Sequence, residues 1–165
     1  MIYLKKKNEE VFYYKSKNYS FISNKHINFL KSRVYKTKKK RARICLHKNV
    51  KDKLHEMIIV LSKQTYIRPH KHEKKVESLH VIQGSADVIF FNNNGKIVKK
   101  ERLSKKKNFF YRLSSAKFHT FKIRSKFFIF HEATEGPFIK NKTVFAKWSP
   151  KENDKKKAKY YINAL

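Results

Sequence analysis

Three residues near the middle of this 165-residue chain have the types and the spacing of metal ligands. His70 and His72 are two residues apart, and Glu77 follows five residues later. In a β-strand, residues two apart point to the same face, so both imidazoles can reach one ion. Divalent transition metals take such nitrogen ligands at about 2.0–2.1 Å. The spacing therefore predicts a metal site that begins with this histidine pair.

Glu77 joins that pair if the polar stretch 73–76 is a turn. Its carboxylate then returns on the neighbouring strand, about 4.8 Å away. A fourth ligand is predicted at His119, because His119, Phe121 and Ile123 alternate with polar residues in "FHTFKIR". Taken alone, an inward histidine of this kind is more often a core residue than a ligand. Mixed nitrogen and oxygen donors suit Fe(II), Mn(II), Zn(II), Ni(II) or Co(II), and these residues do not choose among them.

The elements that must position these ligands are predicted to be strands. From about residue 43 to residue 133, short runs rich in β-branched and aromatic residues follow one another without a helical pattern between them, and "NNNG" at 92–95 suits a tight hairpin turn. The runs are 42–47, 55–62, 65–72, 77–84, 86–92, 96–103, 109–113, 118–124 and 126–132. This pattern is typical of an all-β sandwich or barrel.

Three further residues are candidates for substrate binding. In a strand over 65–72, Tyr66 and Arg68 share the face of His70, and the Arg68 guanidinium can pair with a carboxylate or a phosphate. At the barrel rim Arg68 would instead only reach solvent. Glu132, in "IFHEATEG", is a candidate for the pocket or for proton transfer, although a glutamate at a strand end is more often a surface residue. His131 beside it is considered for the same roles.

Outside the strand region, the sequence predicts an N-terminal hairpin and one helix. Residues 2–5 and 11–14 are expected to form the hairpin, and 20–36 carries a helical apolar stripe with Ser20 or Asn24 as its cap. The predicted organisation is therefore 1–40 as a hairpin and helix extension packing on the barrel, 41–150 as the barrel, and 151–165 as a lysine-rich C-terminal tail, mobile or lightly packed.

The net charge of +30 raises the question of a nucleic-acid partner. Bidentate recognition of phosphates and bases favours Arg, but only seven of the 42 basic residues are Arg. The lysines are spread over every segment of the chain. The abundance of Lys, Asn, Ile, Phe and Tyr is what an AT-rich coding sequence imposes. The composition thus argues against nucleic acid, with the run 36–43 interpreted first as a flexible connector. Such a positive field still attracts small anions.

The cysteine count, the N-terminus and the lengths of the apolar stretches indicate the cellular compartment. Cys45 is a single cysteine, which excludes an internal disulfide. The N-terminus lacks a secretory signal, and no apolar stretch approaches the roughly 20 residues that span a bilayer. A cytoplasmic protein without a membrane partner is expected.

A family resemblance follows from the same residues. The spacing of His70, His72, Glu77 and Gly84 resembles the first cupin motif, and His119 stands where the second motif places its histidine. "RARICLH", "LHEMIIVL", "YIRPHKH", "ESLHVIQG", "FHT", "HEATEGPF" and "FAKWSP", read in order, resemble the WbuC family of cupin-fold metalloproteins over roughly residues 20 to 150. The resemblance implies a double-stranded β-helix jelly roll in which three histidines and one glutamate hold a metal inside the barrel. It allows a homodimer, because cupins commonly pair through their sheets.

The expected function is binding of, or action on, a small anionic metabolite such as a sugar nucleotide. The WbuC resemblance implies surface-polysaccharide biosynthesis of the O-antigen type, without a settled reaction. A bound metal could polarise a carbonyl or activate water, as in an isomerase or lyase. The alternatives are an Fe(II)-dependent oxygenase and a non-catalytic metal or ligand-binding module.

Overall fold

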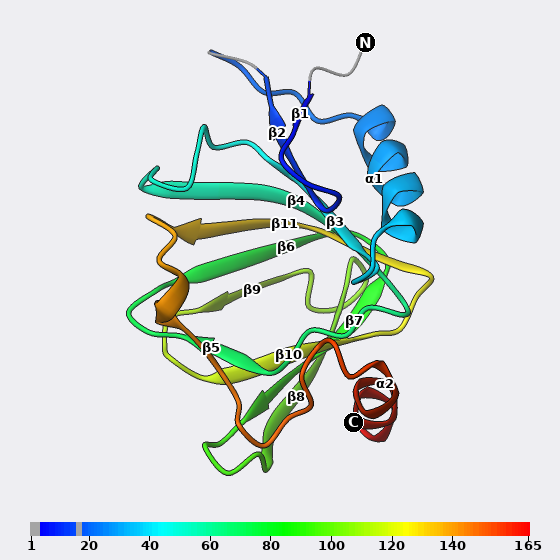
Figure 1. Ribbon diagram of the computed structural model, residues 1–165, viewed down its shortest axis with the longest axis vertical. Helices are drawn as coiled ribbons and strands as arrows, with labels where there is room; N and C mark the ends of the chain where they lie inside the picture. The colour runs from blue at the N-terminus through cyan, green and yellow to red at the C-terminus, as the bar shows by residue number, and fades with distance from the viewer. Residues whose placement is uncertain (1–3, 16–17) are drawn as a thin grey trace.

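The strands of this protein are connected mostly by turns and are arranged as two facing sheets (Figure 1). The structure is a computed structural model that describes residues 4–15 and 18–165. Its strands are β1 (Leu4–Lys6), β2 (Val11–Tyr14), β3 (Arg41–Cys45), β4 (Leu54–Ser62), β5 (His70–His72), β6 (Glu77–Gln83), β7 (Ser85–Phe91), β8 (Ile97–Ser104), β9 (Phe110–Leu113), β10 (Phe118–Ile123), β11 (Phe127–Glu135) and β12 (Thr143–Phe145). Its helices are α1 (Asn24–Lys36), α2 (Lys155–Ala164) and the short 3-10 helix Lys140–Lys142.

The two sheets have the topology of a jelly roll. One sheet has the order β1-β2-β3-β4-β11-β6-β9 and the other the order β12-β5-β10-β7-β8. The paired strands are antiparallel, with the exception of the parallel pair β2–β3. From β4 to β11, the chain crosses repeatedly from one sheet to the other, so each sheet is assembled from segments far apart in sequence. The predicted all-β barrel is confirmed.

The core lies between the sheets, where every second residue of a strand points inward. β4 contributes Met57, Ile59 and Leu61, and β11 contributes Phe128 and Phe130. On β6 and β10, the inward faces continue from these apolar residues to Glu77 and His119, both of which are buried. The candidate metal ligands therefore occupy one end of the hydrophobic core.

α1 covers the outer face of the seven-stranded sheet. Its buried residues Ile27, Leu30 and Val34 pack against Val60 and Ile129. β4 is thus covered on both faces, which accounts for its continuous apolar run. The cap is Ser23, whose backbone N–H donates to Nδ1 of His26 at 3.2 Å, so the predicted caps Ser20 and Asn24 are wrong.

The N-terminal hairpin is present as the antiparallel pair β1–β2. Residues 2–3 of the predicted hairpin lie outside the described residues. The predicted strand 65–72 is much shorter than expected, because only His70–His72 is extended in a sheet. The preceding segment turns away to contact the C-terminal part of the chain.

The lysine-rich C-terminal segment is a helix, where the sequence predicted a mobile or lightly packed tail. α2 lies beside the five-stranded sheet (Figure 1), with Ala158 buried and the ring of Tyr161 at 6.2 Å from that of Tyr66. The Asp154 side chain caps it by accepting from the backbone N–H of Lys157 at 3.1 Å. Lysines occupy the exposed face of α2, and they make its short apolar stripe difficult to recognise in the sequence.

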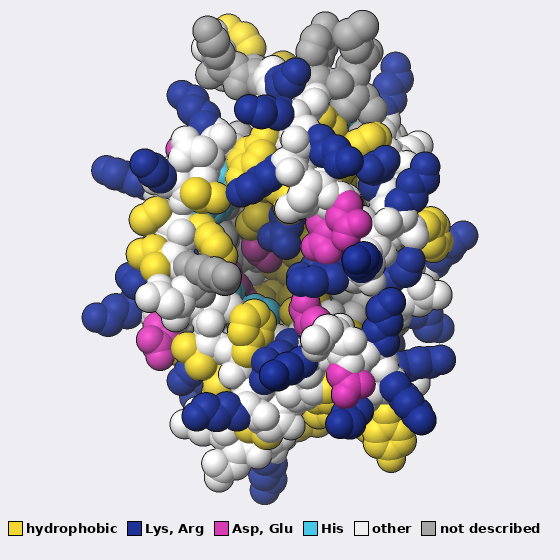
Figure 2. Space-filling view, in the orientation of Figure 1, with side chains coloured by type: hydrophobic (Ala, Val, Ile, Leu, Met, Phe, Trp, Pro, Cys, Tyr) yellow, Lys and Arg dark blue, Asp and Glu magenta, His cyan; other side chains and the backbone are white. Residues whose placement is uncertain are grey.

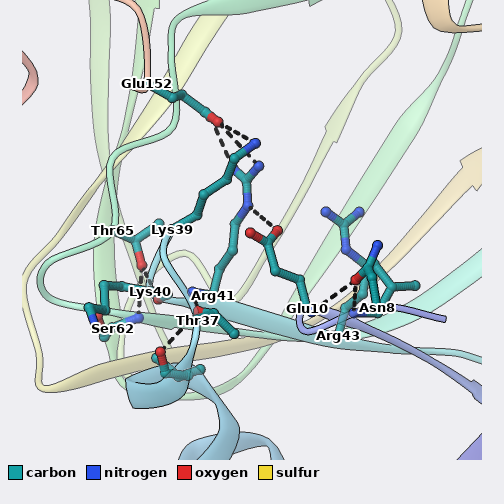
Figure 3. Close-up of polar contacts among 12 residues, drawn as sticks. Asn8, Glu10, Thr37, Lys39, Lys40, Arg41, Arg43, Ser62, Thr65 and Glu152 are labelled. Carbon is teal, nitrogen blue, oxygen red and sulfur yellow. Dashed lines mark hydrogen bonds and ion pairs between the residues drawn. The ribbon is translucent and has the colours of Figure 1, made fainter. Parts of the chain in front are cut away.

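An ion-pair network joins the two ends of the chain to β3 (Figure 3). Nε of Arg41 lies 3.2 Å from Glu10, and its Nη1 lies 3.1 Å from Glu152. Lys39 contacts Glu152 at 2.9 Å. The basic run 36–43 is therefore not a flexible connector. It contains the last residue of α1 and the first residues of β3, and its Lys39 and Arg41 form ion pairs with acidic side chains.

Candidate metal centre

Two neighbouring strands bring the histidines together. His70 on β5 is directly opposite His119 on β10, although 49 positions separate them in the sequence. His72 follows two residues later on β5. One ligand atom of each histidine lies within 4.8 Å of those of the other two, which is close enough for a shared ion. The fold therefore assembles the cluster of His70 and His72, which were predicted from their spacing, with His119, which was predicted from the alternation of its strand.

Each imidazole is oriented by an outer hydrogen bond. Nδ1 of His70 is 3.0 Å from the carbonyl oxygen of Arg68, and Nδ1 of His119 is 3.0 Å from that of Lys117. Because a carbonyl only accepts, both Nδ1 atoms carry the proton, and Nε2 is left as the ligand atom. Nδ1 of His72 lies 3.2 Å from the Thr143 hydroxyl. Such outer partners fix the tautomer and raise the basicity of histidine ligands.

Glu77 reaches the cluster from the opposite sheet. The prediction that it returns on the strand next to His70 and His72 is therefore wrong, because β5 pairs with β10 and β12 and β6 belongs to the other sheet. Oε1 of Glu77 lies 3.0 Å from Nε2 of His119, and its Oε2 lies 3.6 Å from Nε2 of His72. The Tyr111 hydroxyl donates to the same Oε1 at 3.0 Å. Glu77 thus bridges two of the three histidines but lies outside the triad whose ligand atoms are all mutually close.

The charge distribution couples Glu77 to His119. Burial alone would raise the pKa of Glu77, but His119 and the other histidines lower it to about 2. Burial alone would lower the pKa of His119, but the Glu77 carboxylate raises it above its usual value. Without a metal, the two groups form an ion pair, so a bound metal would replace the His119 proton.

His70 has the opposite character. Burial, together with the neighbouring His119 and His72, lowers the pKa of His70 to about 3. Burial is also the main reason that the pKa of His72 is lowered. Both imidazoles are therefore neutral at physiological pH, which is the form that binds metals.

Further polar residues surround the cluster inside the barrel. Glu132 is half-buried on the inward face of β11, and burial together with Glu77 raises its pKa to about 7. Arg43 on β3 and Lys75 in the turn before β6 act on it in the opposite direction. The space-filling view shows a central hollow with histidine and acidic side chains at depth (Figure 2). Lys and Arg side chains lie above this hollow and to its right in this view, and hydrophobic side chains border it on the left.

Arg43 and Tyr111 were not anticipated from the sequence. On β3, Arg41 and Arg43 share one face, which its polarity would assign to solvent although it points into the barrel, and on β9 each face carries an apolar residue. Arg43 is opposite Ile59, an inward core residue, and Tyr111 is opposite Leu79. Knowledge of the strand register would have identified both, but the sequence supplies no register.

Tyr66 and Arg68 are placed differently from the prediction. The Tyr66 hydroxyl donates to the carbonyl of Pro150 at 3.0 Å, and Nη2 of Arg68 donates to that of Ala146 at 2.6 Å. The Arg68 guanidinium also stacks over Phe145, at 5.5 Å from the ring centre. Their polar groups hold the segment 145–150 against β5, so the same-face argument, which required a strand through 66–70, does not apply.

Two other histidines of the region are separated from the cluster. His80 is exposed on the outer face of β6. His131 is opposite His80, and its Nε2 contacts Oε1 of Glu56 at 3.3 Å. Neither contributes to the metal-capable group.

Comparison with known proteins supports the fold and leaves the family open. Residues 22–103, just under half of the chain, match a family described only as a domain of unknown function (DUF6016). No curated protein matches.

Similar solved structures include the capsular polysaccharide assembling protein CapF from Staphylococcus aureus. In one crystal form, it has a TM-score of 0.54 at 16% identity over 62% of this chain and 31% of CapF. In another the TM-score is 0.51 at 16% identity, over 58% and 27%. Oxalate decarboxylase OxdC from Bacillus subtilis matches with a TM-score of 0.45 at 19% identity, over 57% and 24%. The chain thus spans under a third of the length of CapF.

Together, the sheet topology and the CapF likeness define the cupin fold, a double-stranded β-helix jelly roll with an N-terminal hairpin and helix. The histidine cluster inside this barrel supports a site for a divalent metal. Among the described residues, no helix is both long and apolar enough to cross a membrane.

Proposed function

We propose that this protein is a metal-dependent cupin whose barrel interior binds a small anionic metabolite. The observation that carries the proposal is the convergence of His70, His72 and His119 with their Nδ1 atoms engaged outward. Glu77 is the proposed fourth ligand, because its carboxylate already contacts two of these imidazoles.

The donor set suits a divalent transition metal such as Fe, Mn, Zn, Ni or Co. Three imidazoles and one carboxylate leave coordination positions for a ligand on an octahedral ion. When bound, such an ion acts as a Lewis acid toward a carbonyl or phosphoryl oxygen. Glu132, whose raised pKa allows it to exchange a proton near neutral pH, is the proposed proton-transfer residue.

The anionic character of the ligand is proposed from the cations near the site. His72 lines a cavity of about 70 Å³ in which the cations Lys74, Lys75 and Lys142 outnumber the acids Glu73 and Glu135. Arg43 acts electrostatically on Glu132 inside the barrel. Direct substrate contact by Tyr66 or Arg68 stays a prediction. It would require these side chains to give up the hydrogen bonds that they make with backbone carbonyls.

A sugar nucleotide of surface-polysaccharide biosynthesis is the proposed ligand. This part of the proposal comes from the resemblance to the WbuC family in the ordered motifs between residues 20 and 150. The same general process appears in the name of CapF, the capsular polysaccharide assembling protein. An isomerase or lyase-type reaction at the metal is the corresponding activity.

The metal site is tested by purification under anaerobic conditions followed by metal quantification. We expect near-stoichiometric metal in the wild type and a loss of most of it in His70→Ala, His72→Ala, Glu77→Ala and His119→Ala. His80→Ala is the matched control, because this histidine is exposed on the other face of β6. Near-stoichiometric metal in all four site variants would remove the proposal.

The ligand is tested on the same preparation by native mass spectrometry. A co-purifying sugar nucleotide in the wild type, absent from the His119→Ala variant, would support the proposed substrate class. The second candidate function is an Fe(II) oxygenase, for which this nitrogen and oxygen donor set is also suited. It predicts oxygen consumption by the iron-loaded protein with the captured molecule, whereas an isomerase or lyase consumes none. Metal retention without turnover would identify a binding module.

A further inference from the structure

A second cavity of the barrel opens between β8 and β9, away from the cations around His72. These strands are the free edges of the two sheets, and in the turn that joins them the N–H of Ser104 donates to the carbonyl of Asn108. The gap between them is a groove of about 510 Å³. This volume is in the range of sites that enclose organic ligands, about 300–1,000 Å³.

The walls of the groove are apolar. Val88, Phe90, Leu103 and Tyr111 form its inner part, and Val98 and Phe110 form its outer part. Val98 is 58% exposed and Phe110 is 51% exposed, although both line the same groove. Exposed apolar surface that is gathered in one place is typical of a binding site. An apolar ligand body would remove this surface from water.

The rim of the groove is cationic. Lys99, Arg112 and Lys117 line it, and Glu101 is its single acid. Glu101 is already engaged, by Lys99 at 3.6 Å and by Nδ2 of Asn108 at 3.1 Å. Within the described part of the chain, neither Arg112 nor Lys117 forms an ion pair, so two charges remain to receive an anionic group.

Two aromatic rings separate the groove from the metal ligands. The ring of Phe90 lies 6.3 Å from that of His119 and 6.3 Å from that of Tyr111. Tyr111 presents its ring to the groove, while its hydroxyl donates to Glu77 on the other side. The groove is therefore a separate compartment that shares one wall residue with the candidate metal centre.

We infer that this groove binds an amphipathic organic anion, with an aromatic or medium-chain aliphatic body between β8 and β9 and a carboxylate or sulfonate at Arg112 and Lys117. A second copy of the chain is disfavoured as the occupant, because each copy has a net charge of +30 and the rim itself is cationic. The inference requires neither a metal nor the ligand proposed above.

The test uses 8-anilinonaphthalene-1-sulfonate, an aromatic sulfonate whose fluorescence rises when it leaves water. Binding is measured for the chelator-treated protein and for two charge-reversed double variants, Arg112→Glu/Lys117→Glu and Lys105→Glu/Lys106→Glu. The second pair lies in the turn outside the groove and changes the net charge equally. We expect the first double variant to bind the probe about tenfold more weakly and the control to change little.

A second pair of variants tests the walls. Val98→Asp places a charge in the groove, whereas Ile97→Asp, at the neighbouring 41% exposed position, does not line it. Val98→Asp should abolish saturable probe binding, and Ile97→Asp should retain it. Octanoate should displace the probe from the wild type. The inference would be overturned if the Arg112/Lys117 variant bound the probe as tightly as the Lys105/Lys106 variant, or if Val98→Asp bound it as tightly as Ile97→Asp. It would also be overturned if Val98→Asp disrupted a dimer of the protein but still bound the probe. Metal content does not enter these measurements, so failure here and failure of the metal site remain distinguishable.

Discussion

At the residue scale, Tyr111 is the side chain with two separate tasks. Its ring is a wall of the β8–β9 groove, and its hydroxyl donates to Oε1 of Glu77 at 3.0 Å. Burial and the nearby Glu77 raise its pKa well above the usual value, so it remains a neutral donor. It is a positioning residue for the proposed carboxylate ligand.

Removing only the hydroxyl should separate these tasks. Outer hydrogen-bond partners of metal ligands are typically worth 10–100-fold in affinity, so we expect Tyr111→Phe to weaken metal binding about tenfold. Competition with a chromogenic chelator measures that affinity. Binding of the anilinonaphthalene probe should be unchanged, because the ring stays. Tyr160→Phe, which alters an 80% exposed tyrosine, is the control. Unchanged metal affinity in Tyr111→Phe would show that Glu77 is positioned without it.

At the element scale, a histidine of the connection from β3 to β4 stacks on a histidine at the start of β4. The rings of His47 and His55 are nearly parallel, with centres 4.1 Å apart. Burial, and for His47 also the neighbouring His55, lowers the pKa of both groups. Lys75 lowers the pKa of His55 further, whereas Asp52 partly offsets these effects for both. A proton on either ring is therefore less favourable in the folded state than in the unfolded chain.

The pH dependence of stability follows from the sign of these shifts. Below the unfolded pKa of about 6.5, the unfolded chain binds more protons at these positions, so the free energy of unfolding decreases as the pH falls. We expect urea unfolding in the presence of a chelator to show a smaller loss from pH 7.5 to pH 5 in His47→Gln/His55→Gln than in the wild type. His80→Gln should follow the wild type. The same pH dependence in all three proteins would contradict the prediction.

The elements themselves were predictable where one physical signal dominated. The strands from 77 to 132 follow from β-branched and aromatic runs, and the apolar stripe of α1 follows from its 3.6-residue period. The segment 65–69 was not predictable as a loop, because its β-rich composition is overridden by tertiary contacts of Tyr66 and Arg68 with residues 146–150. α2 was missed because its lysines leave only Ala158 to be buried.

The candidate site was predictable to the extent that it is local in sequence. The interval from His70 to Glu77 indicated which residues meet, but not how they meet, because β5 and β6 are not neighbouring strands and belong to different sheets. His119 required an additional inference from face parity and from the family resemblance. Arg43, Tyr111 and the β8–β9 groove depend on which strands become neighbours, and that information is absent from any single segment.

At the scale of the whole molecule, a metal at the centre would link the two sheets. His70, His72 and His119 belong to the five-stranded sheet, and Glu77 belongs to the seven-stranded sheet. An ion that binds only the folded state stabilises it by about 2.7 kcal/mol when its free concentration is 100 times its Kd.

Metal removal should therefore lower the thermal midpoint of the whole barrel. For a chain of this length, the stabilisation corresponds to a shift in Tm of about 5–10 °C between the metal-saturated and the chelator-treated protein. Differential scanning calorimetry should record this shift in the wild type and in His80→Ala, and its absence in His119→Ala. A shift of equal size in His119→Ala would indicate that the ion stabilises the protein from another place.

The pairing of β4 with β11 has a consequence for folding during synthesis of the chain. β4 ends at Ser62, but the partner that covers its second edge begins only at Phe127. The roughly 65 residues between them require about 3–13 s of synthesis at about 5–20 residues per second. During that time, the run Met57–Leu61 is an apolar strand with an unpaired edge. Lys51, Lys53 and Lys63 flank it, and charges at such flanks oppose association between nascent chains.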